Sequence, residues 1–255
     1  MLNAGRHNSG TLVIDDRTPH NLRLGEFSEA TSAFGDLERA QIEILHRLVR
    51  AIEHRDDDTG RHTHRVGELA ALIARSLDFP KDRVELIRIA APLHDVGKVG
   101  IPDKILLKPE KLTAEEYETI KTHTKIGSAI LSGSRLPFLQ LAEKIALYHH
   151  ERWDGNGYWG VRSESIPVEA RIVSIADTFD VLTHRRPYKH AWSVHDAVAE
   201  INSQSGRQFD PHLVDVFTRV VCSDGLRALS NPAGNATASL HRPRSGSNAC
   251  HSPQR

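Results

Sequence analysis

Helical periodicity is the feature that most constrains the fold of this chain. Between residues 36 and 225, apolar side chains recur at spacings of three and four, as in Leu37, Ile44, Leu48 and Ile52. This spacing places them along one face of an α-helix. No segment of useful length alternates apolar and polar residues as a strand does, and there is no internal repeat. The sequence therefore predicts an all-α fold.

Start and stop signals divide this pattern into successive helices. Thr113 with Glu116 forms a capping box, Pro80 is a favoured first helical residue, and Gly97 is a stop signal. We predict helices over about 37–52, 62–77, 80–97, 113–131, 138–150, 167–182, 193–202 and 211–221. They form one helical bundle domain over residues 36–225. Residues 1–35 are predicted to be a flexible leader, and residues 226–255, rich in Ser, Asn, Arg and Pro, a disordered tail.

Composition excludes several classes of protein. The formal net charge is zero with 26% charged residues, which argues against a basic surface for nucleic acid. No apolar run approaches a membrane span, and the N-terminus lacks the apolar core of a secretory signal. The only two cysteines, Cys222 and Cys250, provide neither a disulfide framework nor a cysteine zinc site. We expect a cytoplasmic protein that binds neither nucleic acid nor membrane.

Histidine and aspartate gather at inward positions of successive predicted helices. The chain has sixteen histidines, and histidine is a common metal ligand. Each inward histidine alone is compatible with a hydrogen-bonded core residue. Asp177 lies in the most apolar helix, where an unpaired carboxylate costs several kcal/mol, so it needs a cation partner. Together these residues predict a metal centre, with candidate ligands His62, His94, Asp95, His123, His149, His150 and Asp177.

Three segments carry a resemblance to a known family. They are HDVGKVGIPD at residues 94–103, HHERWDGNGY at 149–158 and RPYK at 186–189. In these segments the chain resembles the HD-GYP subgroup of HD-domain phosphohydrolases, over about residues 37–220. The resemblance implies an all-helical fold with two or three divalent metal ions, usually iron or manganese. It also implies hydrolysis of cyclic di-GMP in bacterial second-messenger signalling.

The resemblance also implies roles for individual residues. The seven candidate ligands match the metal-binding positions, and Asp95 matches the ligand that bridges two metals. Catalytic roles are implied for Asp95, Lys98 and Asp180. Lys98 matches the lysine near the scissile phosphate, and Asp180 matches an acidic position behind the ligands, one helical turn beyond Asp177. Substrate binding is implied for Lys98, Tyr158, Arg186 and Lys189. For Arg186 and Lys189 a solvated loop is the alternative.

Two positions leave questions open. Asp58 lies four residues before His62, where members with three metals often carry glutamate. Aspartate is one methylene shorter, so a third metal held by Asp58 stays open. Trp159 stands where the family has the proline of its Gly-Tyr-Pro triplet, and tryptophan cannot fix the loop backbone as proline does. Substrate fit or partner recognition at this loop is therefore open too.

The implied mechanism is hydrolysis by metal-activated water. A metal pair lowers the pKa of bound water towards about 7, which supplies hydroxide at neutral pH. Lys98 would stabilise charge on the phosphoryl group, while Arg186 and Lys189 anchor the substrate phosphates. The expected product is linear pGpG, with further cleavage to GMP favoured by a third metal.

The N-terminal segment has a second, shorter resemblance. TLVIDD at residues 11–16 and NLRL at 21–24 look like the opening strand and acidic pair of a response-regulator receiver domain. The receiver is otherwise missing, so we interpret residues 1–35 as a truncated receiver remnant and expect no phosphorylation of Asp15 or Asp16. An unrelated flexible leader is the alternative.

Three other interpretations compete with cyclic di-GMP hydrolysis. The domain could act on another cyclic dinucleotide or nucleotide, because pocket walls rather than metal ligands select the base. It could be a non-catalytic module that docks a diguanylate cyclase (GGDEF) protein through the Gly-Tyr-Trp loop, or a metal-free helical bundle. A homodimer is a further expectation on assembly.

Overall fold

The computed structural model describes residues 39–55, 61–184 and 191–222. The chain divides into two compact units, Met1–Ile44 and Leu45–Arg255. Of the first unit only residues 39–44 are described, and they are helical. The predicted leader, the receiver remnant and the C-terminal tail beyond residue 222 lie outside the described residues.

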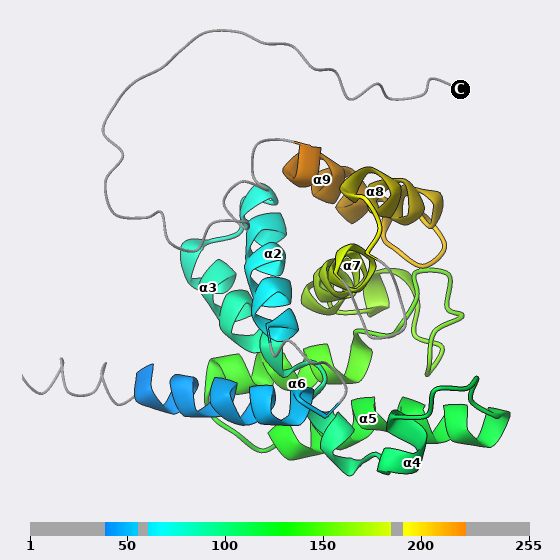
Figure 1. Ribbon diagram of the computed structural model, residues 1–255. Helices are drawn as coiled ribbons and strands as arrows, with labels where there is room; N and C mark the ends of the chain where they lie inside the picture. Colours follow the sequence, from blue (N-terminus) through cyan, green and yellow to red (C-terminus); the bar gives the residue numbers. More distant parts are fainter. Residues whose placement is uncertain (1–38, 56–60, 185–190, 223–255) are drawn as a thin grey trace, which may run out of the picture. The chain divides into compact units, whose positions relative to one another are not determined.

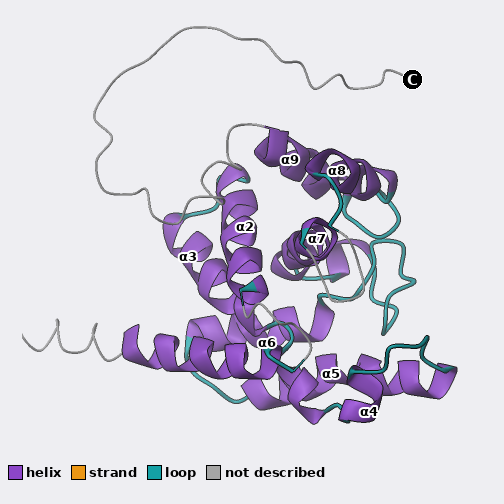
Figure 2. Cartoon of the chain, in the orientation of Figure 1, coloured by secondary structure: helices purple, strands orange, loops and turns teal. Residues whose placement is uncertain are grey.

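Helices make up most of the described part of the second unit, so the predicted all-α fold is confirmed (Figure 2). Apart from an isolated bridge between Ser205 and Phe209, the described residues contain no β-structure. Residues 45–53 are helical, as predicted. The elements after them are α2 (His62–Ser76), α3 (Lys81–Ala90), η1 (Ala91–Leu93), η2 (Val96–Gly100), α4 (Asp103–Leu106), α5 (Ala114–Leu131), α6 (Pro137–Tyr148), η3 (Ser163–Ser165), α7 (Val168–Thr183), α8 (Val194–Ser203) and α9 (Pro211–Cys222), where η marks a 3₁₀ turn.

The predicted capping box at the start of α5 is confirmed. The Glu116 amide donates to Thr113 Oγ1 at 3.3 Å, and the Thr113 amide donates to the Glu116 carboxylate at 2.8 Å. Two free amides at the helix end are thereby satisfied.

One predicted helix is wrong in its second half. The helix expected over 80–97 ends at Ala90 and continues as the 3₁₀ turns η1 and η2, with Pro80 as N-cap residue. Pro92 explains the break, because it lacks an amide hydrogen and its ring would clash with the carbonyl four residues earlier. His94 and Asp95 consequently lie between two tight turns rather than at the end of an α-helix.

Helix α7 lies at the centre of the bundle. It contacts α2, α6, α8 and α9, and Figure 1 shows it beside α2 and below the pair formed by α8 and α9. Most of its side chains from Ala170 to Leu182 are buried. The inward face of α2, which includes Val66 and Ile73, is fully buried. Burial of such apolar surface is the main stabilising term in the fold.

A glycine contact brings α5 against the turn that follows Asp95. A Cβ atom on Gly97 would lie 1.9 Å from the His123 carbonyl oxygen and 2.4 Å from the Gly127 amide nitrogen. Only glycine allows so close an approach of two backbones. The contact sets His123 opposite Asp95.

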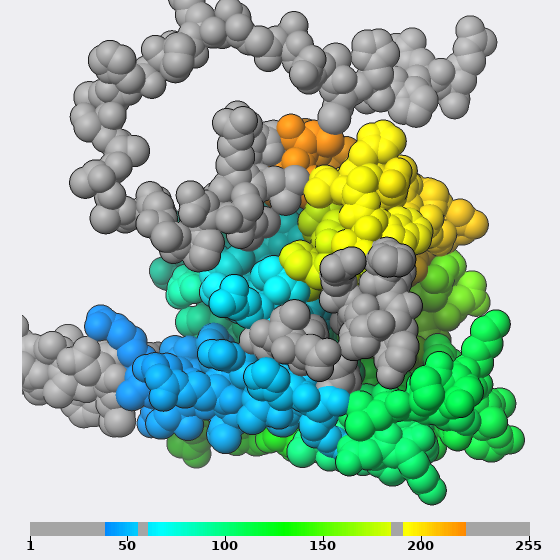
Figure 3. All heavy atoms as spheres, in the orientation of Figure 1, coloured from blue at the N-terminus to red at the C-terminus, as the bar shows by residue number. Residues whose placement is uncertain are grey.

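Glu53 and Arg55, at the end of the helical segment before α2, bond to α2 and to the turn after Asp95. The buried Glu53 carboxylate accepts hydrogen bonds from the Thr63 amide at 3.0 Å and the Thr63 hydroxyl at 3.1 Å. It therefore serves as the cap for α2, whose own N-cap residue Arg61 makes no side-chain bond. The Arg55 guanidinium donates to the carbonyl of Lys98 at 3.0 Å and binds the Asp103 carboxylate. In Figure 3 the blue atoms of this segment adjoin the green atoms around α4.

Among the helices of the described ranges, none is both long and apolar enough to span a membrane.

Candidate metal centre

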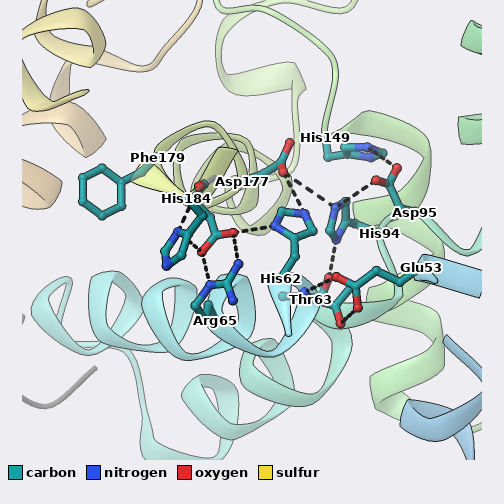
Figure 4. A network of polar contacts seen from close by, with 12 residues as sticks. Glu53, His62, Thr63, Arg65, His94, Asp95, His149, Asp177, Phe179 and His184 are labelled. Atoms are coloured by element: carbon teal, nitrogen blue, oxygen red, sulfur yellow. Dashed lines mark hydrogen bonds and ion pairs between the residues drawn. The ribbon is translucent and has the colours of Figure 1, made fainter. Parts of the chain in front are cut away.

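The seven predicted ligands fall into two adjacent groups of donor atoms. Within each group the donor atoms lie within 4.8 Å of one another. One group consists of His62, His94 and Asp177, and the other of Asp95, His123, His149 and His150. The donors come from α2, the turns after α3, α5, the end of α6, and α7, and part of the arrangement is drawn in Figure 4.

Asp95 lies between the two groups and faces each of them with one oxygen. Its Oδ1 is 3.2 Å from His123 Nε2 and 3.6 Å from His149 Nε2. Its Oδ2 is 3.4 Å from His94 Nε2 and 2.8 Å from Lys98 Nζ. A carboxylate placed in this way can bind one cation through each oxygen.

The backbone orients three of the histidine rings. Nδ1 of His94 donates to the Ala91 carbonyl at 2.9 Å, and Nδ1 of His123 to the Ile120 carbonyl at 2.7 Å. His149 makes the same kind of bond to the Ala146 carbonyl at 3.0 Å. A carbonyl can only accept, so these rings carry hydrogen on Nδ1 and turn Nε2 towards the centre, where the lone pair of a neutral ring can bind a metal ion.

A carboxylate orients the fourth ring. Nδ1 of His62 lies 2.7 Å from Asp180 Oδ2, and Asp180 also accepts two bonds from the Arg65 guanidinium at 2.6 and 2.8 Å. On its other side, His62 Nε2 lies 3.2 Å from Asp177 Oδ1. Figure 4 shows His62 pointing to Asp177, with Arg65 and His184 on the side away from His94. Asp180 therefore contacts a ligand rather than the centre itself.

The two groups differ in their electrostatics. Burial favours neutral His62, but its bonds to Asp177 and Asp180 outweigh burial and raise the pKa of His62 to about 10. In the other group, burial lowers the pKa of His149, and burial together with His149 holds the pKa of His150 well below its usual value. His149 and His150 are thus neutral at pH 7, which is the form that binds metals.

Asp95 is held in its charged form. Burial favours its protonated form, but the positive charges of Lys98 and His94 outweigh burial and hold the pKa of Asp95 well below its usual range. Burial opposes ionisation of Asp177 as well, and its bond to His62 lowers the pKa of Asp177 nonetheless. Two carboxylates are therefore ionised among the imidazoles.

The donor set fits divalent cations. His94 Nε2 and Asp95 Oδ1 are buried and make no hydrogen bond to the rest of the described chain. Such atoms cost about 1–3 kcal/mol each when left unsatisfied, and a shared cation removes that cost. Imidazole and carboxylate donors together suit iron, manganese or zinc.

Of the other predicted site residues, the structure describes Lys98 and Tyr158. Lys98 lies beside Asp95, and the Tyr158 ring packs on His150 with 4.7 Å between ring centroids. Asp58, Arg186 and Lys189 lie outside the described residues.

Two neighbours of the centre were missed by the sequence interpretation. The Arg65 guanidinium binds the Asp180 carboxylate. The sequence could have indicated Arg65, because it lies three residues after His62 and therefore on the same helix face. Glu53 caps α2 next to His62, and no local sequence signal identifies a cap that comes from another helix.

Comparison with known proteins identifies the class to which this fold and donor set belong. Residues 47–213 match the family model described as HD domain. The chain belongs to the HD domain family.

Several curated proteins are similar to the chain. It is 45% identical over 213 residues to the cyclic di-GMP phosphodiesterase response regulator RpfG of Xanthomonas campestris, covering 83% of this chain and 55% of that protein. It is 47% identical over 192 residues to a cyclic di-GMP phosphodiesterase of Thermotoga maritima, covering 75% and 52%. It is 40% identical to 3'3'-cGAMP-specific phosphodiesterase 2 of Vibrio cholerae, covering 76% and 37%. The chain thus spans about half the length of the first two relatives.

Solved structures share the fold at low sequence identity. A cyclic GMP-AMP-specific phosphodiesterase of V. cholerae superposes with a TM-score of 0.56 at 21% identity, covering 75% of this chain and 51% of that one. The HD domain of the phosphodiesterase PgpH of L. monocytogenes, solved with cyclic di-AMP, gives a TM-score of 0.51 at 18% identity, covering 76% and 100%. These similarities support the all-α fold.

Proposed function

We propose that this protein is a cyclic di-GMP phosphodiesterase of the HD-GYP subgroup. The observation that carries the proposal is the position of Asp95, which turns one oxygen to each of two groups of metal-binding side chains. Such an arrangement suits a pair of cations acting on one phosphodiester. Two relatives above 40% identity bear the name cyclic di-GMP phosphodiesterase, which supports the same substrate.

The metal ligands in this proposal are the seven residues of the two groups, and the ions are iron or manganese. Asp58 would serve a third ion. When bound, divalent cations acidify a water molecule and neutralise charge on a phosphoryl group, which is the chemistry that diester hydrolysis requires.

The protein's own side chains have separate tasks. Lys98 Nζ is 2.8 Å from Asp95, and its side chain is 23% exposed, so it can reach a phosphoryl oxygen or the departing 3′ oxygen while still paired. Asp180 accepts the Nδ1 hydrogen of His62 and so keeps Nε2 directed inward, where it can bind a metal ion once its hydrogen is displaced. We assign Asp180 to positioning of His62. Arg186 and Lys189 are proposed to hold the substrate phosphates.

The proposed product is linear pGpG, and GMP follows if a third ion binds. No serine or cysteine nucleophile is needed in this scheme.

The test is anaerobic purification of the full chain with metal analysis, followed by chromatography of the products of cyclic di-GMP. We expect at least two metal ions per chain and conversion to pGpG. The matched pair of variants is Asp95→Asn and Asp210→Asn, which make the same change at a ligand and at a buried aspartate paired with Arg171. Only Asp95→Asn should lose turnover. A metal-loaded protein that leaves cyclic di-GMP intact contradicts the proposal.

A second candidate substrate is 3'3'-cGAMP. It is favoured by the 40% identity to a V. cholerae phosphodiesterase named for that nucleotide. Assaying both nucleotides under identical conditions and comparing kcat/KM decides between them. Docking of a diguanylate cyclase and formation of a homodimer stay predictions. Binding to a GGDEF protein without any turnover would favour the docking role.

A further inference from the structure

The loop after His150 is fastened to two ligand-bearing segments by a single residue, Trp159. Its amide donates to Glu151 Oε1 at 2.7 Å, and its indole Nε1 donates to Thr124 Oγ1 at 3.0 Å. Glu151 follows His150 directly, and Thr124 follows His123 on α5. Both acceptors are buried, with exposed fractions of 3% and 0%.

Further contacts hold the indole and the loop in one position. Lys125 Nζ lies 3.4 Å from the centre of the Trp159 ring, which is a close cation–π contact. The amide of Val161 donates to Glu151 Oε2 at 2.9 Å. A Cβ atom on Gly157 would lie 2.6 Å from the Glu151 Cα, so this stretch of loop packs on the backbone beneath it. The loop therefore has little freedom between residues 157 and 161.

The residue that this arrangement places is Tyr158. Its ring centroid lies 4.7 Å from that of His150, 6.2 Å from His123 and 6.0 Å from Tyr117. Burial, then Tyr117 and Asp95, raise the pKa of Tyr158, so its hydroxyl keeps its hydrogen at neutral pH. The Tyr158 ring thus covers one side of the group formed by Asp95, His123, His149 and His150.

We propose that Trp159 is a positioning residue for substrate binding, acting through Tyr158. Its two hydrogen bonds hold Tyr158 against His123 and His150 as a wall beside the bound cyclic dinucleotide. This inference rests on the proposed function. A proline at position 159 would restrict the loop by its ring but has no amide hydrogen for Glu151. Tryptophan supplies the restraint through hydrogen bonds instead.

The experiment uses the full, manganese-loaded chain and cyclic di-GMP. Trp159→Phe removes the indole N–H together with part of the ring that lies against Lys125, and Thr124→Val removes the acceptor of that N–H. Each should raise KM about three- to tenfold, the effect of one lost neutral hydrogen bond, with kcat and metal content unchanged. Because the bond between Trp159 and Thr124 is common to both changes, the rise of KM in the double variant should be smaller than the product of the two single effects. Trp192→Phe, at a tryptophan outside both ligand groups, is the control and should match wild type.

A second pair of variants tests whether Trp159 affects KM through Tyr158. In a Tyr158→Ala background, Trp159→Phe should change KM no further. An equal rise of KM in that background overturns the inference, as does a loss of metal content in Trp159→Phe.

Hydrogen exchange separates this inference from the proposed function. In metal-loaded protein without nucleotide, Trp159→Phe should speed amide exchange in residues 157–161, while Trp192→Phe should not. If wild-type protein cleaves no cyclic dinucleotide, the proposed function fails, and unchanged exchange at residues 157–161 overturns the inference on its own.

Discussion

Replacement of Asp180 by asparagine tests how the protein prepares His62 for a metal ion. The amide keeps the size of the side chain, and its oxygen can still accept the His62 Nδ1 hydrogen now bonded at 2.7 Å. What is lost is the negative charge that faces His62 and Arg65. A hydrogen bond to a charged group is worth about 1.5–3 kcal/mol, and a neutral one about 0.5–1.5. The difference of about 1–1.5 kcal/mol corresponds to roughly a tenfold loss of metal affinity.

The assay is titration of metal-stripped full-length protein with manganese in competition with a chelator. One binding step should weaken about tenfold, at the low end of the 10- to 100-fold range for partners of metal ligands. The step that belongs to Asp95, His123, His149 and His150 should not change.

Asp210→Asn is the matched control. Asp210 is 7% exposed and pairs with Arg171 at 2.5 Å, but it contacts neither ligand group. Its replacement should lower the melting temperature and leave both manganese affinities as they are. Wild-type affinities in Asp180→Asn, or an equal loss in Asp210→Asn, would refute the positioning role of Asp180.

Three further predictions concern the centre and its support. Asp95→Ala should lose bound metal and turnover together, as measured by metal analysis and product chromatography; a variant that retains both removes the basis for a shared ligand. The pKa of His62 is raised from 6.5 to about 10, so its protonation stabilises the metal-free fold fully below pH 6.5, and this contribution is lost as the pH rises through about 10. Urea unfolding in chelator should show that decline, and His62→Gln should reduce it. Gly97→Ala should lower the free energy of unfolding by about 3 kcal/mol or more, because its Cβ would overlap the His123 carbonyl. Gly100→Ala is the control and should lower it less, because its Cβ meets only the flexible Ile126 side chain. Equal losses in denaturant unfolding would contradict this explanation.

Local signals were sufficient for most helix boundaries. The Thr113–Glu116 box and the apolar spacing of α2 led to boundaries that agree with the structure within about a residue, because both depend on contacts within one turn or one face. The break at Ala90 follows from Pro92, which interrupts a helix more strongly than Gly97, the residue on which the predicted end depended.

The sequence motifs indicated the candidate ligands and the acidic position of Asp180 next to them, but they did not indicate which residues make contact there. Asp180 lies 118 residues from His62, the histidine it orients, and the Glu53 side chain caps α2 from the preceding helix. Such partners are chosen by packing between helices, and no periodicity within either helix identifies them. The contribution of Trp159 belongs here as well, since both of its acceptors lie elsewhere in the chain.

The sequence by itself determined that the chain is helical, which faces of its helices are apolar, and which histidines and aspartates are available as ligands. Those properties depend on residue type and on spacing over a few turns. Only the tertiary structure decided how the candidate ligands divide into two groups around Asp95, because that depends on the close approach of α5 to Gly97 and on the central position of α7. Distances between donor atoms from five segments are set by backbone packing, and a side chain meets its metal partner only after that packing has formed.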